Sequence, residues 1–282
     1  MTNIALLGAT EIREIANRLD LRPAKSMGQN FVIDGNSCQK IVRAGGVTSN
    51  DLVLEIGPGL GSLSLAIMQA GAKLVAVEID NRLSDELSKT LISHNCEADN
   101  FEIINKDALV LTELAVSPTK LVANLPYNVS VPVLLHILEK FPSINSGVVM
   151  VQSEVAERLA AKPGSKIYGI PSAKAAWWAD LTLSGTISRS VFWPVPNVDS
   201  SLVKFQRHAP LGSEAERTAT FAVIEQAFSQ RRKMLRSVLA ELSGGNSQAE
   251  SLLQSIGIDP TLRGEALTVS DFLAISKALI KK

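Results

Sequence analysis

One stretch decides the fold and carries the candidate site: Val122-Ala123-Asn124-Leu125-Pro126-Tyr127-Asn128. Its apolar start predicts a buried strand, and the residues that follow predict a polar turn stiffened by a proline. Such a strand delivers Asn124 and Tyr127 to the carboxyl edge of a sheet, where ligands bind in open α/β folds. We therefore expect a ligand site at this turn; the alternative is a plain proline turn after a buried strand.

Strands and helices alternate around this stretch. Strands are expected at residues 52–56, 73–78, 101–105, 120–123 and 147–152. Helical patterns between them predict an α/β fold, with a parallel sheet covered by helices on both faces. Two later strands, at 180–188 and 200–207, are expected to run antiparallel. From about residue 210 the chain is helical, so we predict a first domain at 1–209, opened by a helical extension, and a small helical domain at 210–282.

The composition limits the kinds of partner that the protein can bind and the compartment in which we expect it. Lys and Arg number 28, and Asp and Glu number 28, so nucleic acid must be met by local basic patches rather than by net charge. Cys38 and Cys96 have neither disulfide nor zinc spacing, which favours a reducing cytoplasm and no metal. We also expect neither a secretory leader nor a membrane span, since no run of roughly 18 apolar residues occurs.

A glycine-rich loop follows the first expected strand of the alternating series: Glu55-Ile56-Gly57-Pro58-Gly59-Leu60-Gly61. Its glycines let a ligand approach the backbone closely. A dinucleotide site would have glycine at the sixth position from Gly57, where Ser62 stands, and no Lys-Ser or Lys-Thr follows to make a P-loop. The alternative interpretation is a tight strand-to-helix turn without a ligand.

Two acids follow the next two strands. Glu78 ends its strand and can accept hydrogen bonds from ribose hydroxyls, unless it is only a solvated strand end. Asp107 follows the third strand and can accept from an adenine amino group or, alternatively, cap a helix. Both acids favour a nucleoside-containing cofactor at the same edge of the sheet.

The turn at Asn124 suits methyl transfer to an exocyclic amine. The lone pair of such an amine is delocalised, and two carbonyl acceptors on its N–H groups would stabilise the positive charge of attack. Asn124 offers its side-chain carbonyl and Leu125 its backbone carbonyl, which Pro126 holds in an extended conformation. Tyr127 offers a ring for base stacking, worth roughly 1–3 kcal/mol per base. The donor would be a strong methyl electrophile such as S-adenosylmethionine, and no general base is needed.

Four motifs occur in order: Gly28-Gln29-Asn30-Phe31, Glu55 to Gly61, Asn124 to Asn128, and Phe192-Trp193-Pro194-Val195-Pro196-Asn197-Val198-Asp199-Ser200. From about Lys25 onward the chain thereby resembles the ribosomal RNA adenine dimethyltransferases, in particular the branch that acts on 16S rRNA. The resemblance implies a Rossmann-like S-adenosylmethionine-dependent methyltransferase domain with a small helical C-terminal domain. It also implies that two adjacent adenines near the 3′ end of 16S rRNA are each dimethylated at N6 during small-subunit biogenesis.

The resemblance assigns cofactor contacts to Asn30, Val32, Gly57, Glu78, Asp107 and Asn124. Asn30 and Val32 would line the methionine end, although the family usually has Leu at the position of Val32. It assigns the catalytic contacts to Asn124, Leu125, Tyr127 and Phe192. Tyr127 and Phe192 would sandwich the target base, but a Phe between strands is otherwise more often a core residue.

Two basic patches are candidates for contact with 16S rRNA in the small subunit: Arg158, Lys162, Lys166 and Lys174, and Arg231, Arg232, Lys233 and Arg236. Each cation can neutralise a phosphate, or the patches can be solvated faces. Two other functions stay open. One is an RNA-binding assembly factor without turnover. The other is a DNA or small-molecule N6-adenine methyltransferase, although DNA enzymes usually have proline where Leu125 stands. We expect a monomer.

Overall fold

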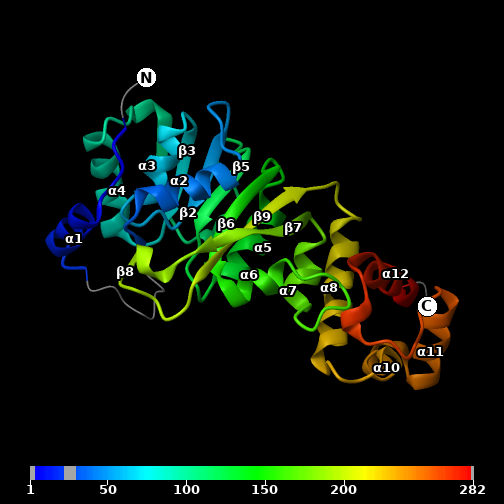
Figure 1. The fold of residues 1–282 in the computed structure, drawn as a ribbon. Coiled ribbons are helices and arrows are strands. Elements are labelled where there is room, and N and C mark those ends of the chain that lie inside the picture. The colour runs from blue at the N-terminus through cyan, green and yellow to red at the C-terminus, as the bar shows by residue number, and fades with distance from the viewer. Residues whose placement is uncertain (1–3, 22–29, 281–282) are drawn as a thin grey trace. The chain divides into compact units, whose positions relative to one another are not determined.

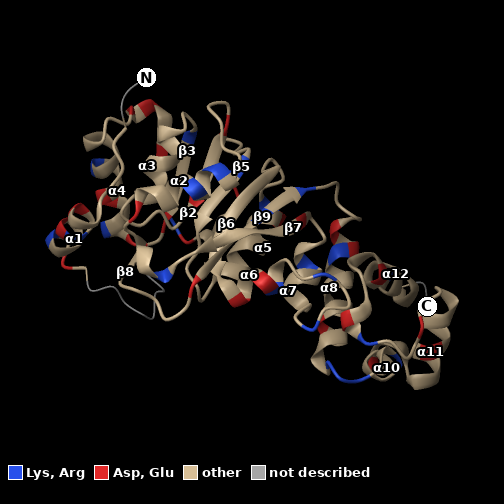
Figure 2. Cartoon of the chain, in the orientation of Figure 1, with Lys and Arg blue, Asp and Glu red and all other residues tan. Residues whose placement is uncertain are grey.

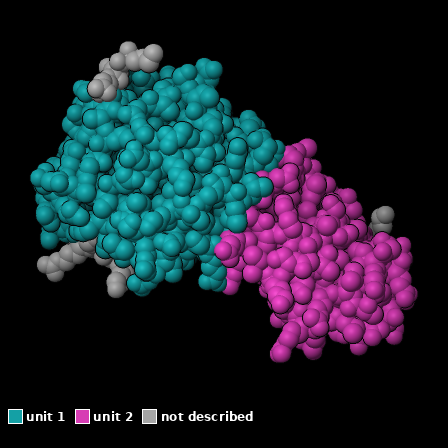
Figure 3. Space-filling model, viewed as in Figure 1, with its two compact units in different colours: residues 1–156, 182–207 teal, residues 157–181, 208–282 magenta. Residues whose placement is uncertain are grey.

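The computed structural model describes residues 4–21 and 30–280. Gly28 and Gln29 of the first motif lie outside these ranges. The chain divides into two compact units, the first formed by residues 1–156 and 182–207 and the second by 157–181 and 208–282 (Figure 3).

A seven-stranded sheet in the order β4-β3-β2-β5-β6-β9-β7 forms the centre of the fold (Figure 1). Its strands are β2 (Leu52–Ile56), β3 (Lys73–Glu78), β4 (Phe101–Asn105), β5 (Lys120–Asn124), β6 (Ser146–Gln152), β7 (Ala179–Ile187) and β9 (Ser200–Arg207). The first five of these run parallel, and β9 pairs antiparallel with β6, from Ser146 opposite Gln206 to Gln152 opposite Ser200. The predicted Rossmann-like α/β fold is confirmed.

The strand order places the carboxyl ends of β2 and β5 side by side. From β2 the chain moves outward through β3 to β4, and it then returns to the other side of β2 to form β5 and β6. The loops after β2 and β5 therefore diverge at the point where the strand order reverses. Such a switch point opens a crevice at the carboxyl edge of a parallel sheet.

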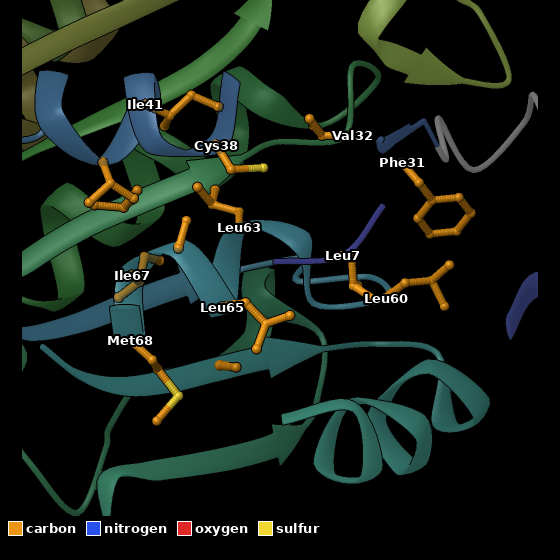
Figure 4. Packing of buried hydrophobic residues seen from close by; sticks show 14 of the residues in the cluster. Leu7, Phe31, Val32, Cys38, Ile41, Leu60, Leu63, Leu65, Ile67 and Met68 are labelled. Carbon is orange, nitrogen blue, oxygen red and sulfur yellow. The ribbon is translucent and has the colours of Figure 1, made fainter. Parts of the chain in front are cut away.

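Helices cover both faces of the sheet. On one face lie α1 (Ala9–Arg18), α2 (Gly35–Ala44), α3 (Ser62–Gln69) and α4 (Asn81–Ser93). Their apolar residues form one core with Val53, Leu74 and Val122 of the strands, and Figure 4 shows α2 and α3 contributing side chains to it. The alternate strand residues, such as Leu54 and Ala123, are equally buried. Their face of the sheet is covered by α5 (Ser130–Lys140).

The second unit is helical. Its helices are α7 (Ile170–Ala175), α8 (Glu214–Ser229), α9 (Leu235–Val238), α10 (Ala240–Ser243), α11 (Asn246–Ser255) and α12 (Val269–Ile280). Ile224, Leu253 and Phe272 lie in its core, and so do Tyr168 and Ala173. Residues 157–181, which the predicted boundary near 210 leaves with the first domain, therefore pack with the helices. The helix α6 (Ser153–Leu159) spans the change from one unit to the other.

Neither a membrane span nor a metal cluster is found in the described part of the chain. None of its helices combines the length and apolar character needed to cross a bilayer. No group of three or more His, Cys, Asp or Glu side chains there is placed to hold a metal ion.

Candidate active site

A cavity of about 300 Å³ lies at the carboxyl edge of the sheet, in the first unit. That volume is within the range of small-molecule sites. Its lining includes these residues predicted from the sequence: Asn30, Val32, Gly57, Glu78, Asp107, Asn124, Leu125 and Tyr127. The cavity thus brings together the residues expected to hold a cofactor and those expected to hold the target amine.

The loop after β2 depends on glycine at the positions that line the cavity. Gly57 and Gly59 have φ angles of +69° and +59°, a region that other residues rarely adopt. The Gly57 N–H donates to the Val77 carbonyl over 2.9 Å, which ties the loop to β3. A Cβ atom on Gly59 would lie 3.0 Å from the ring of Phe31. Gly59 therefore packs too closely against Phe31 to carry a side chain, and its backbone lines the cavity directly.

Glu78 is held by this loop. Its Oε2 atom accepts from the Gly59 N–H over 3.1 Å, and its Oε1 atom accepts from the Asp80 N–H over 3.0 Å. Only 5% of Glu78 is exposed, so it is not the solvated strand end considered above. Burial raises the pKa of its carboxyl group, and backbone donors at Asp80, Gly59 and Ile79 partly oppose that shift. These three bonds use three of the roughly four acceptor positions of the carboxylate, which leaves one that can accept from a ribose hydroxyl.

A second buried acid, Glu55, lines the cavity and was missed in the sequence analysis. Its Oε2 atom accepts from the Ser64 hydroxyl over 2.6 Å, and 1% of the residue is exposed. Burial raises the pKa of Glu55 to about 8, and the negative charge of Glu78 adds to the shift although the Ser64 bond opposes it. The signal was present, because Glu55 is the single charged residue in the apolar strand Leu52–Ile56.

Asp107 caps a short helical turn beside the cavity. Its Oδ1 atom accepts from the Leu109 N–H over 2.9 Å, at the start of a 3-10 turn, Ala108–Val110. The capping alternative considered above is therefore present. Asp107 also lines the cavity, so the two roles are compatible, because a carboxylate has two oxygens.

Asn124 is oriented by the backbone of Asn30. The Asn124 Nδ2 atom donates to the Asn30 carbonyl oxygen over 3.2 Å. Since the amide nitrogen is used in this bond, the Oδ1 carbonyl is the atom that can accept from a ligand donor. The half-buried side chain lies in the cavity lining, at the end of β5.

The rest of the turn after β5 is anchored on both sides. The Leu125 N–H donates to the Met150 carbonyl over 3.1 Å. A Cβ on Gly57 would lie 3.7 Å from the Pro126 ring, so the glycine loop and the turn are neighbours. The half-buried ring of Tyr127 lines the cavity, and its hydroxyl lies 2.8 Å from Ser200 Oγ. Burial raises the pKa of Tyr127.

Phe192 lies apart from the cavity lining. It belongs to a short strand, β8 (Phe192–Trp193), which pairs antiparallel with β1 (Phe31–Val32), so that Phe192 stands opposite Val32. Its ring is 1% exposed and packs in the apolar core, the alternative considered in the sequence analysis. In this structure Phe192 is buried outside the cavity lining, so the sandwich of Tyr127 and Phe192 stays a prediction.

The two basic patches meet within the second unit (Figure 2). Arg231 donates to the Lys166 carbonyl and pairs with Glu265 over 3.0 Å. Lys174 pairs with Glu225 over 2.5 Å and Arg236 with Glu250 over 3.2 Å. The exposed cations of the joined patch are Arg158, Lys162, Lys166, Arg231, Arg232 and Lys233.

Comparison with known proteins gives concordant matches. The family model described as "Ribosomal RNA adenine dimethylase" matches residues 21–281. The "Ribosomal RNA small subunit methyltransferase A" of Leifsonia xyli subsp. xyli is 52% identical over 278 residues, covering 98% of this chain and 99% of its own. The protein of the same name from Streptomyces griseus subsp. griseus is 53% identical over 276 residues, covering 97% and 95%.

Two solved structures share the fold. A dimethyladenosine transferase from Plasmodium falciparum superposes with a TM-score of 0.73 at 24% identity, covering 86% of this chain and 94% of its own. The 23S rRNA methyltransferase ErmE superposes with a TM-score of 0.65 at 22% identity, covering 89% and 99%.

Proposed function

The chain belongs to the ribosomal RNA adenine dimethylase family, and on that premise we propose that it dimethylates N6 of two adjacent adenosines near the 3′ end of 16S rRNA. It is an S-adenosylmethionine-dependent methyltransferase of ribosomal RNA. The proposed partner is the small ribosomal subunit during its biogenesis, the proposed compartment is the cytoplasm, and the proposed active form is a monomer.

The residues of the cavity fit S-adenosylmethionine. Gly57 and Gly59 line the cavity with backbone alone, and the Glu78 carboxylate, which is held by the Gly59 N–H, can accept from a ribose hydroxyl. In this proposal Asn30 and Val32 line the methionine end, Gly57 approaches the cofactor, and Asp107 faces its adenine. When bound, S-adenosylmethionine supplies the electrophilic methyl group.

The turn after β5 would hold the target base. Asn124 Oδ1 and the Leu125 carbonyl accept from the two N–H groups of the adenine amine, which localises the nitrogen lone pair. Both carbonyl dipoles are oriented before the reaction, so they stabilise the positive charge on N6 without reorganising. Tyr127 stacks on the base. Phe192 can complete the stack only if its ring leaves the core.

The exposed cations of the second unit would bind the RNA backbone. Lys162, Lys166, Arg232 and Lys233 are exposed in the joined patch. Phosphate contacts of this kind orient the RNA without reading its sequence. We assign the choice of the target adenines to the shape of the RNA together with the pocket at Asn124.

One observation carries the proposal. The hydrogen bond from Asn124 to Asn30 leaves the Asn124 Oδ1 atom as an acceptor in the same cavity that the Gly59 backbone lines. The test is incubation with labelled S-adenosylmethionine and unmethylated small subunits, followed by mapping of the modified bases. We expect two adjacent adenosines near the 3′ end of 16S rRNA, each with two methyl groups. Absence of label from the 16S rRNA, or label confined to bases other than these two adenosines, would contradict the proposal.

A further inference from the structure

The hydroxyl of Tyr127 forms a hydrogen bond with a residue 73 positions away in the chain. Tyr127 Oη lies 2.8 Å from Ser200 Oγ. Ser200 is the first residue of β9, opposite Gln152 at the end of β6, and it is fully buried. The hydroxyl of a serine so placed is not available to solvent, so its partner is the phenol.

Hydrogen bonds to the preceding residue hold the backbone at Ser200 in place. The carbonyl of the preceding residue, Asp199, accepts from both the N–H and the Oγ of Ser153, each over 3.1 Å. The Asp199 Oδ1 atom accepts from the Arg189 N–H over 2.9 Å. Ser200 Oγ is therefore a fixed point on the sheet rather than a residue of a free loop.

The backbone of Tyr127 is also held. Its carbonyl accepts from the Ser130 hydroxyl over 3.4 Å, at the start of α5, and Pro126 precedes it. A tyrosine ring moves by rotation about two side-chain torsions. With the backbone held at one end and the hydroxyl at the other, rotation out of the cavity requires the bond to Ser200 to break.

We propose that Ser200 is a positioning residue, which holds the ring of Tyr127 in the cavity so that it presents a stacking face to the target base. This inference rests on the proposed function, because the base is the adenine to be methylated. Ser200 touches neither the amine nor the methyl donor. Its effect therefore passes only through the phenol hydroxyl.

A double-mutant cycle tests that single route. Ser200→Ala and Tyr127→Phe each remove the same hydrogen bond, from opposite sides. We expect each variant to lower kcat for methylation of small subunits about fivefold to tenfold, the range that one net hydrogen bond corresponds to. The double variant should be no slower than the slower single variant, because effects through one shared contact do not add.

Ser201→Ala is the matched control. Ser201 is the next residue of β9, is also buried, and has its hydroxyl 2.8 Å from Ser153 Oγ rather than near Tyr127. We expect this variant to keep the wild-type kcat. Calorimetric affinity for S-adenosylmethionine and the melting temperature should be the same for Ser200→Ala and Ser201→Ala, which a merely structural role of Ser200 would not give.

The outcomes separate the inference from the function on which it rests. A wild-type kcat in Ser200→Ala, or effects of the two single variants that multiply in the double variant, would overturn the inference alone. If Ser200→Ala does not fold, a wild-type kcat in Tyr127→Phe overturns it equally. Absence of any methyl transfer by the wild-type chain would overturn the proposed function as well.

Discussion

The Gly59 N–H donates to Glu78 Oε2 over 3.1 Å, so that the glycine loop after β2 and the acid at the end of β3 form one structure. This bond explains how a carboxylate that is 5% exposed remains at the edge of a largely apolar cavity. It also makes the orientation of Glu78 independent of any ligand. Loss of the carboxylate should therefore affect cofactor binding before it affects chemistry.

Glu78→Gln is expected to weaken S-adenosylmethionine binding about tenfold to a hundredfold, the range for hydrogen bonds to a charged group. The amide replaces one acceptor oxygen by a donor, which cannot accept from a ribose hydroxyl. Calorimetric titration measures the affinity. Asp85→Asn, on the exposed side of α4, should leave it unchanged. Equal affinity in wild type and Glu78→Gln would remove Glu78 from the ribose site.

Gly59→Ala is expected to lower both stability and cofactor affinity. The added Cβ meets the Phe31 ring at 3.0 Å, in addition to about 1–2 kcal/mol for a left-handed alanine. Gly46→Ala is the matched control, because Gly46 has a similar φ of +61° and nothing within 4 Å of a Cβ. Denaturant unfolding should show a larger loss of stability, and calorimetry a larger loss of cofactor affinity, for Gly59→Ala than for Gly46→Ala. Equal losses would show that the close contact with Phe31 does not matter.

Glu55→Gln is expected to change how stability depends on pH. The pKa of Glu55 in the folded chain is about 8, above its ordinary value of 4.5. Between these values the folded state binds more protons than the unfolded state, so a rise in pH lowers the free energy of unfolding. The wild type is fully stabilised below pH 4.5 and loses this contribution as pH rises through about 8.

Glutamine does not ionise, so the stability of Glu55→Gln relative to wild type should increase from pH 5 to pH 8. The expected increase is on the order of a few kcal/mol, measured by urea unfolding at both pH values. The exposed Glu102 provides the control variant Glu102→Gln, which should show no such trend. A constant difference across that pH interval would mean that Glu55 is ionised throughout.

Charge reversal at Arg232 and Lys233 is expected to weaken binding to small subunits. Each cation that contacts a phosphate contributes about 1 to the slope of log affinity against log salt. The double reversal should therefore reduce the slope by about 2, measured by binding at several salt concentrations. Lys73→Glu, at the start of β3, is the control. An unaltered slope would exclude these two residues from RNA contact.

The sheet and most of the cavity could be predicted because their signals are local. An apolar strand followed by Asn124, and another followed by Gly57, place both turns at the carboxyl edge by strand direction alone. Glu78 and Asp107 follow from the same rule. Their hydrogen bonds could not be predicted, since the bond from Asn124 to Asn30 joins residues 94 positions apart.

Other features depend on contacts that no local pattern reveals. Tyr168 packs against residues of α8 and α12, although strands β7 and β9 separate it from those helices in sequence. Phe192 lies in the core, on strand β8, which pairs with β1, and each of these strands has two residues. The two basic patches meet because Arg231 bonds to Lys166, 65 positions away.

The central claim is that the oriented carbonyl of Asn124 activates the adenine amine. Single-turnover methylation of small subunits by Asn124→Ala, with cofactor affinity measured by calorimetry on the same preparation, tests it most directly. The account predicts that methyl transfer falls by at least about a hundredfold, as when one preorganised group is removed, while S-adenosylmethionine binding persists. Methyl transfer at close to the wild-type rate would contradict the account.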